Sequence, residues 1–364
     1  MALSIDKNPL QWVLPHVLKL KPYSSARDEF SGQAEVYLDA NENAYGSVGL
    51  GGGAVQWHRY PDPHASEFRQ VVGKMVGLEA AQVFVGNGSD EAIDLLMRTF
   101  CAPSLHKIIV MPPTYGMYQV SAGINNLAVL NVPLKSDFQI DMPALATVMA
   151  SEPLARLLFA CSPNNPTGNL MLAADIVHVC DTFDGIVVVD EAYIDFTDRQ
   201  DATKLFAHHP NLVVIRTLSK AWGLAALRIG LAFASADLVA ILQKVKPPYN
   251  LSGPAHALAL EALTTGQEAK NGVVRQLNQQ HRWLREQLVL LPIVAEVYPS
   301  DANFVLVRFG IEVKATQVYQ YLLDKGIVVR DRSSQPGCAN CLRITIGTEA
   351  ENQKLIVALL SYQV

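Results

Sequence analysis

Short runs of apolar residues alternate with helix-like periods between about residues 64 and 234. The runs are nearly continuous, as in Gly185-Ile-Val-Val-Val-Asp190, which is typical of strands covered on both faces. Apolar residues spaced three or four positions apart indicate helices near 65–76, 92–100 and 173–183. We therefore predict an α/β fold with a mostly parallel sheet flanked by helices. Its strands are expected at 81–85, 107–111, 157–161, 185–190, 211–216 and 228–233.

The last third of the chain indicates a second, smaller α+β unit. Helices are expected at 237–246, from Pro254, at 267–290, at 314–325 and from Glu349. Strands are expected at 294–298, 303–308, 326–330 and 342–346. We predict three parts: 1–45, an N-terminal arm with part of the small domain; 46–250, a large domain; and 251–364, a C-terminal small domain.

The N-terminal segment carries weaker signals. Residues 12–18 indicate a short amphipathic helix interrupted by Pro15, 21–27 an extended arm, and 35–39 a strand. The glycine-rich stretch 46–53 lacks the GxGxxG order, so we interpret it as a loop and not as a phosphate cradle.

Composition excludes several classes of protein. The chain has 364 residues, of which 50% are hydrophobic and 17% charged, so it can bury a sizeable core. A net charge of −5 argues against binding of nucleic acid. No apolar run approaches the roughly 18 residues of a membrane span, and the N-terminus does not resemble a signal peptide.

The cysteines point to a reducing compartment. An odd, dispersed set of five predicts free thiols and a cytoplasmic protein. Cys338 and Cys341 have the spacing of half a zinc site, but no second pair accompanies them, so no metal site is predicted.

Polar side chains follow the predicted strands at the point where each strand ends. In open α/β sheets, ligands bind at the carboxyl ends of the strands. A convergence there indicates a site, although single residues such as a tyrosine could equally belong to the core. The residues are Ser89, Tyr115, Asn165, Asp190, Tyr193 and Lys220.

Lys220 lies in a loop between two predicted strands. By itself it could be a solvated surface charge. Among apolar neighbours, however, its amine would have a lowered pKa and could bond covalently to a carbonyl cofactor. Ser219 beside it and Arg228 farther along the loop could grip a phosphorylated aldehyde.

The turn Gly86-Asn-Gly-Ser-Asp-Glu91 leads directly into a predicted helix. Free N–H groups at such a helix start can bind phosphate. Ser89 or Asp90 could instead cap the helix in the ordinary way.

Three motifs together resemble the fold-type-I aminotransferases that depend on pyridoxal 5'-phosphate (PLP). They are Ser162-Pro-Asn-Asn-Pro-Thr-Gly168, Asp190-Glu-Ala-Tyr193 and Ser219-Lys-Ala-Trp-Gly-Leu-Ala-Ala-Leu-Arg228. Further segments, among them Asp39-Ala-Asn-Glu-Asn43 and Cys341-Leu-Arg-Ile-Thr-Ile-Gly347, resemble the histidinol-phosphate aminotransferases within that family. The likeness extends from about residue 20 to the end of the chain.

The resemblance implies PLP as cofactor and a role for each matching residue. Lys220 would bind the cofactor covalently and later move a proton on the substrate. Asp190 would pair with the pyridine nitrogen. Asn165 and Tyr193 would hydrogen-bond the phenolic oxygen, and Tyr115 would stack on the ring.

The resemblance also implies a phosphate site and a shared active site. The residues around the cofactor phosphate would be Gly88, Ser89, Asp90, Ser219 and Arg228. Tyr60 would reach the phosphate from a neighbouring subunit, so a homodimer is expected.

Four further residues match substrate-binding positions of the family. Arg343 would grip the α-carboxylate of glutamate, and Arg330, with Tyr23 of the partner's arm, would face the substrate phosphate or the distal carboxylate. Asn41 is expected at the substrate as well. The arginines could otherwise be ordinary charges on surface strands. The implied reaction is L-histidinol phosphate plus 2-oxoglutarate giving imidazole-acetol phosphate plus glutamate.

Two other activities fit the same motifs. They are transamination of aromatic amino acids and decarboxylation of threonine phosphate, which is a lyase reaction. A regulator built on this fold would carry a DNA-binding segment ahead of it, and the chain has no room for one before the first motif. Relatives commonly have glycine at Ala226 and phenylalanine or tyrosine at Trp222, so the loop geometry beside the lysine is expected to differ slightly.

Overall fold

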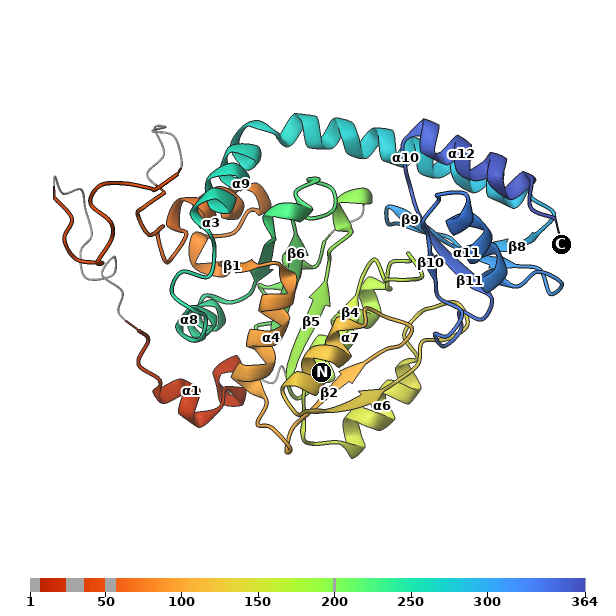
Figure 1. Cartoon of the computed structure of the whole chain (residues 1–364). Coiled ribbons are helices and arrows are strands. Elements are labelled where there is room, and N and C mark those ends of the chain that lie inside the picture. Colours follow the sequence, from red (N-terminus) through yellow and green to blue (C-terminus); the bar gives the residue numbers. More distant parts are fainter. Residues whose placement is uncertain (1–6, 24–35, 50–56, 199–200, 364) are drawn as a thin grey trace.

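The computed structural model describes residues 7–23, 36–49, 57–198 and 201–363, and these form two β-sheets with helices around each (Figure 1). The arrangement confirms the predicted α/β fold with a smaller second unit. The two sheets lie side by side and are joined by the long helix α10 (Gln267–Val289).

The larger sheet has seven strands in the order β1-β7-β6-β5-β4-β2-β3. Every neighbouring pair is parallel except the two that involve β7. The strands are β1 (Val83–Asn87), β2 (Lys107–Val110), β3 (Ala128–Asn131), β4 (Ala155–Cys161), β5 (Ile186–Asp190), β6 (Leu212–Thr217) and β7 (Ile229–Phe233). Because β7 runs the other way, its amino end lies at the edge where the parallel strands end.

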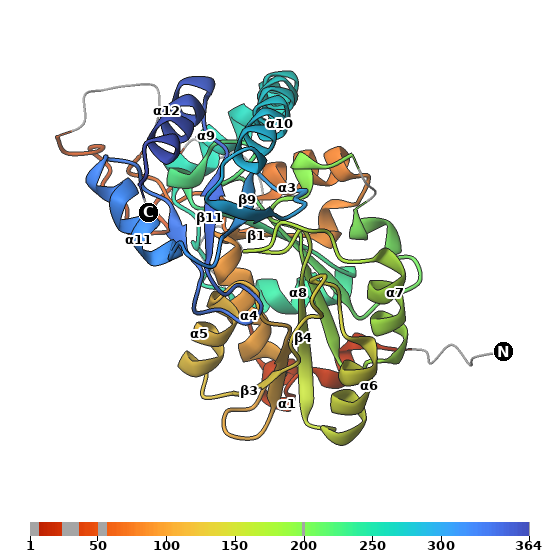
Figure 2. The same cartoon turned by 90° about the vertical axis from the view of Figure 1, so that its right-hand side faces the viewer.

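Helices cover both faces of this sheet, as the view turned by 90° shows (Figure 2). One face packs on α1 (Pro15–Lys19), α4 (Ser89–Phe100), α5 (Met117–Ile124) and α8 (Ala236–Val245). The other packs on α3 (Ser66–Val76), α6 (Met142–Ser151), α7 (Ala173–Thr182) and α9 (Gly253–Thr265). In β5, Val187 and Val189 join one core and Ile186 and Val188 the other, which explains its continuous apolar run.

The smaller sheet is antiparallel, in the order β10-β11-β9-β8. Its strands are β8 (Val294–Val297), β9 (Phe304–Phe309), β10 (Arg330–Asp331) and β11 (Cys341–Thr345). One face is covered by α10, α11 (Ala315–Asp324) and α12 (Glu349–Leu360). The other face is turned toward the loops of the larger unit, where Asp301 and Gly168 share a backbone hydrogen bond of 2.7 Å.

Several elements differ from the sequence prediction. Helices α5 and α6 and strand β3 were not predicted; β3 is a partly exposed edge strand of four residues and so has no buried run. The strand expected at 326–330 begins only at Arg330. Pro15 does not interrupt a helix but opens α1, after the short 3-10 helix η1 (Pro9–Trp12). The remaining 3-10 turns are η2 (Ala80–Gln82), η3 (Ile194–Phe196), η4 (Ala202–Leu205) and η5 (Ala225–Leu227).

The predicted division at residue 250 cuts across a shared core. Helix α9 lies beyond it, yet Ala255, Ala259 and Leu263 pack with the larger sheet. The bounds of the three parts otherwise stay a prediction. Residues 36–39 form no strand, and residue 35 lies outside the described residues. Residues 46 and 47 are irregular and 48 and 49 form a turn, while 50–53 and residues 24–27 of the predicted arm lie outside the described residues.

Candidate active site

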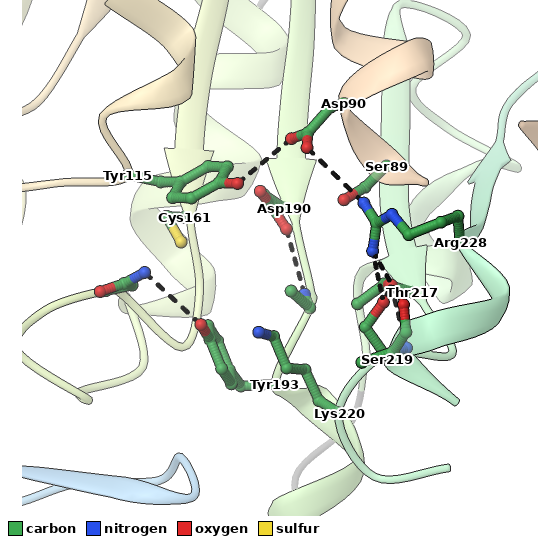
Figure 3. A pocket seen from close by; sticks show the side chains of 13 residues that line it. Ser89, Asp90, Tyr115, Cys161, Asp190, Tyr193, Thr217, Ser219, Lys220 and Arg228 are labelled. Carbon is green, nitrogen blue, oxygen red and sulfur yellow. Dashed lines mark hydrogen bonds and ion pairs between the residues drawn. The ribbon is translucent and has the colours of Figure 1, made fainter. Parts of the chain in front are cut away.

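One pocket lies at the edge where strands β1, β4, β5 and β6 end (Figure 3). It collects all six residues that the strand-end pattern predicted, and Arg228 enters it because β7 begins there. The lining residues are Ser89, Asp90, Tyr115, Cys161, Asn165, Asp190, Ala192, Tyr193, Thr217, Ser219, Lys220, Ala225 and Arg228.

Lys220 borders this pocket, and its amine lies 5.7 Å from the centre of the Tyr193 ring. Part of the side chain is open to solvent through the pocket. The pKa of the amine is nevertheless lowered, first by burial and then by the guanidinium of Arg343, while the carboxylate of Asp190 opposes the shift. A lowered pKa supplies more of the neutral, nucleophilic amine at neutral pH.

Asp190 ends β5 as a fully enclosed carboxylate, 3% exposed. Burial raises its pKa, and two hydrogen bonds counteract the rise. Tyr118 donates its hydroxyl to Oδ2 at 2.7 Å, and the backbone N–H of Ala192 donates to Oδ1 at 3.1 Å. Both carboxylate oxygens are thus held in a fixed orientation.

Tyr118 is the residue that sequence reasoning missed at this carboxylate. It lies on α5, which was not predicted, and is completely buried against Phe159 at a ring distance of 4.7 Å. In the sequence, Tyr118 looks like any tyrosine of the core. The one signal that could have marked it is its position, three residues after the predicted site residue Tyr115.

Tyr118→Phe should lower kcat/KM for the expected transamination roughly tenfold. The variant loses the hydrogen bond to the Asp190 carboxylate, and a hydrogen bond to a charged group is worth about 1.5–3 kcal/mol. The hydroxyl lowers the pKa of Asp190, so its loss should raise that pKa further and move the acid limb of the pH–rate profile to higher pH. Steady-state rates from pH 5 to 9, beside a Tyr321→Phe control in α11, test this. A uniform loss with an unmoved profile would leave Tyr118 a packing residue only.

The start of α4 forms a cradle for an anion. Its cap is Gly88 at φ +78°, and no side chain caps the first N–H groups. The guanidinium of Arg228 lies beside them and is 3.4 Å from Ser219 Oγ. A Cβ on Gly88 would come within 2.6 Å of Arg228 Nη2. Helix N–H groups, a hydroxyl and a guanidinium around a space that only glycine leaves open fit a phosphate.

Gly230 fixes how closely β7 approaches this cradle. A Cβ at Gly230 would lie 2.1 Å from the Ser89 nitrogen and from the Gly88 carbonyl carbon. Gly230→Ala should therefore push the start of α4 outward and destabilise the protein by about 1–3 kcal/mol. Thermal unfolding measures this, with Gly253→Ala, which meets no atom within 4 Å, as the control. Equal unfolding temperatures for the two variants would contradict the close approach.

The opposite wall of the pocket holds Tyr115, Asn165 and Tyr193. Tyr115 donates its hydroxyl to Asp90 Oδ1 at 3.2 Å, and Asn165 Nδ2 donates to Tyr193 Oη at 3.4 Å. Burial raises the pKa of both tyrosine hydroxyls, so they remain protonated donors.

Two arginines of the smaller sheet lie near this wall. Arg343 Nη1 donates to Asn165 Oδ1 at 2.5 Å, and its guanidinium lies 5.2 Å from the Phe304 ring centre. Arg330 is directly opposite Arg343 across β10 and β11 and is exposed. Neither residue lines the pocket itself.

Three further predicted site residues also do not line the pocket within one chain. Tyr23 is 72% exposed. Tyr60 stacks on Tyr249 at 4.4 Å and, with Asn41, lines a separate hollow. All three precede α3 in the chain, and residues 36–49 extend away from the body in Figure 1.

The neighbouring loop accommodates its two unusual residues. Ala226 lies in η5 with no positive φ, so the expected difference from a glycine does not strain the backbone. The Lys270 amine lies 5.5 Å from the centre of the Trp222 ring.

Cys338 and Cys341 are buried free thiols, and no group of ligands that could hold a metal occurs among the described residues.

The comparisons with known proteins all match aminotransferases, over most or all of the chain. The family model for aminotransferase class I and II matches residues 40–359. A histidinol-phosphate aminotransferase of Cytophaga hutchinsonii is 46% identical over 364 residues and covers 100% of both chains. One of Bacteroides fragilis is 44% identical over 350 residues, covering 96% of this chain and 97% of the relative.

Solved structures share the fold. A histidinol-phosphate aminotransferase of Sinorhizobium meliloti in complex with pyridoxal-5'-phosphate has a TM-score of 0.76 at 24% identity, covering 83% of this chain and 82% of that one. An L-threonine-O-3-phosphate decarboxylase of Porphyromonas gingivalis reaches 0.70 at 24% identity, covering 83% and 89%. At this identity they establish the fold alone, whereas the family model and the relatives above 40% identity extend over the catalytic motifs. The chain therefore belongs to the class I and II aminotransferases and, within them, to the histidinol-phosphate aminotransferases.

Proposed function

We propose that the protein transfers the amino group of L-histidinol phosphate to 2-oxoglutarate, giving imidazole-acetol phosphate and L-glutamate, in histidine biosynthesis. One observation carries the proposal: a single pocket joins the Lys220 amine, the enclosed Asp190 carboxylate and an anion cradle. The chain that builds it is 46% identical to a histidinol-phosphate aminotransferase over its full length.

The pocket residues fit PLP, the cofactor of the family. The cradle of Gly88, Ser89, Ser219 and Arg228 would hold its phosphate. Asp190 would lie at its pyridine nitrogen, and Asn165 and Tyr193 at its phenolic oxygen, with Tyr115 against the ring. When bound, PLP supplies an electron sink that stabilises negative charge at the substrate α-carbon.

Lys220 is the residue placed to move a proton in this pocket. Its Nζ would take the proton from the α-carbon of the amino donor, since its lowered pKa leaves it partly neutral. Asp190 would keep a proton, and so a positive charge, on the pyridine nitrogen of the cofactor. This role requires that the carboxylate oxygens of Asp190 stay oriented by Tyr118 and Ala192. The buried β-strand ends behind the pocket exclude water from that side.

Arg343 would bind the α-carboxylate of glutamate and 2-oxoglutarate, because its guanidinium already lies at Asn165 beside the pocket. Arg330, with Tyr23 of a second subunit, would face the distal anion. This division explains how one site could accept a phosphate ester and a dicarboxylate in turn.

A homodimer with shared sites belongs to the same proposal. Leu38, Tyr45 and Val48 lie before α3 with most of their surface exposed, which a monomer rarely tolerates in one segment. A partner that covers this segment would also bring Tyr60 and Asn41 to a second pocket.

The free cysteines fit a cytoplasmic protein. Among the described residues, no helix combines the length and the apolar character that a membrane span needs.

The deciding experiment follows one half-reaction. The protein loaded with PLP is mixed with L-histidinol phosphate alone and, in separate samples, with phenylalanine and with threonine phosphate. Conversion of the cofactor to its amine form should be fastest with L-histidinol phosphate, and sedimentation should give a dimer. Faster conversion with phenylalanine would make the protein an aromatic aminotransferase, and carbon dioxide release from threonine phosphate would make it a lyase.

A further inference from the structure

Four arginines share one face of the smaller sheet; Arg330, Arg332 and Arg343 lie on it without an ion pair among the described residues, and Arg308 pairs with Glu296 at 3.4 Å. Arg330 and Arg343 are cross-strand partners, so their side chains leave the sheet on the same face. Arg332 follows Arg330 by two positions, and its N–H continues the pairing by donating to the Cys341 carbonyl at 2.9 Å. A period of two places Arg332 on that face as well. The bond between Arg343 and Asn165 shows that this face is turned to the larger unit.

The guanidinium groups of Arg330, Arg332 and Arg343 have no carboxylate partner among the residues that the structure describes. Two other partly buried arginines are paired with carboxylates: Arg216 lies 2.9 Å from Glu191, and Arg59 lies 2.6 Å from Glu42. The Nε atoms of Arg332 and Arg343, like that of Arg308, are buried and have no hydrogen-bond partner among the described residues. Buried donors without acceptors are costly, so an anionic ligand is the natural partner for this face.

The electrostatics agree with this geometry. The pKa of Arg332 is lowered, first by burial and then by Arg330, and the pKa of Arg343 is lowered by burial together with both other arginines. Tyr193, a pocket residue, lies close enough to Arg332 and to Arg343 for its ionisation to be coupled to theirs. The three cations therefore repel one another at the margin of the active site, and a bound anion would relieve that repulsion.

We propose that Arg332 contacts the phosphate group of the amino donor together with Arg330, and that this second guanidinium selects a doubly charged phosphate ester over a singly charged carboxylate. The inference rests on the proposed function and adds a specificity-determining residue to it. A phosphate ester carries about −1.5 to −2 charges at neutral pH, whereas the distal carboxylate of 2-oxoglutarate carries one. Two guanidinium groups on one strand face can each bind a pair of phosphate oxygens.

The test compares Arg332→Gln and Arg332→Lys with the unaltered, PLP-loaded enzyme. The substrates are L-histidinol phosphate and L-histidinol, which differ only in the phosphate. Arg332→Gln should raise KM for L-histidinol phosphate about 10- to 100-fold and change kcat little. Its kcat/KM for L-histidinol and its KM for 2-oxoglutarate should stay within about twofold, and Arg332→Lys should recover part of the loss.

Arg308→Gln is the matched control, because Arg308 belongs to the same sheet but pairs with Glu296 at 3.4 Å. Equal losses for L-histidinol and its phosphate, with a lower unfolding temperature, would make Arg332 a structural residue and overturn the proposal. An unchanged KM would overturn it too.

A titration separates this outcome from failure of the proposed function. Glycerol 2-phosphate, which has no amine to react, is titrated into each loaded protein by calorimetry. Arg332→Gln should weaken its binding, and Arg308→Gln should not. If the unaltered enzyme does not convert L-histidinol phosphate, the proposed function fails, while the titration still decides whether Arg332 binds a phosphate ester. Equal binding by both variants would remove Arg332 from the anion site.

Discussion

Lys220→Ala is expected to abolish transamination, with a loss in kcat on the order of 10⁴-fold or more, the upper range for one positioned acid–base group. The amine borders the pocket that also holds Asp190 and the anion cradle, and no second lysine among the described residues lines it. Without Lys220, nothing at that position can bond to a carbonyl cofactor or accept a proton from the substrate.

Reduction with borohydride followed by mass spectrometry gives a readout that does not depend on turnover. The unaltered protein should retain one cofactor covalently, on the peptide containing Lys220, and the variant none. Lys74→Ala, on the exposed surface of α3, is the control and should behave like the unaltered protein. Cofactor trapped on another lysine, or full activity of Lys220→Ala, would refute the assignment.

The same amine should show its environment in a pH titration. In cofactor-free protein, only the neutral amine reacts with an acylating reagent, so the rate of labelling at Lys220 rises with pH through its pKa. Because burial and Arg343 lower this pKa, the midpoint should fall below the ordinary value of 10.5. A midpoint at or above that value would mean that the amine is fully solvated.

Asp190→Asn is expected to lower kcat/KM on the order of 10³-fold, which is the scale of losing one preorganised electrostatic contact in an active site. An amide has nearly the same shape but no charge, so it cannot hold a proton on the cofactor nitrogen. The size of the effect depends on burial: Asp190 is 3% exposed, and little solvent screens its charge from a neighbour.

The half-reaction with the amino donor measures this loss directly, since it isolates the proton transfer from product release. Asp237→Asn, an exposed carboxylate in the first turn of α8, serves as the control. Cofactor content and unfolding temperature should remain close to those of the unaltered protein, because Tyr118 and Ala192 can still hydrogen-bond the amide. Activity within about tenfold of normal would show that the charge of Asp190 is not required.

The sequence by itself determined the framework of this protein. Strands such as β5 are buried on both faces, so their apolar runs are unbroken and visible without coordinates. In a parallel sheet, the residues after such runs meet at one edge, which is why Asp190 and Lys220 could be predicted as partners although they are far apart in the chain. The resemblance to known aminotransferases then assigned a chemical role to each of them.

Only the tertiary structure decided which side chains support that chemistry. Tyr118 looks like any core aromatic until α5 brings its hydroxyl to Asp190. The approach of β7 to α4 through Gly230 depends on antiparallel pairing that no local pattern indicates. Arg332 became a candidate once the register of β10 and β11 set it on the face of Arg343. Local periodicity records which residues are buried, whereas contacts between distant segments depend on register and packing, which the whole fold sets.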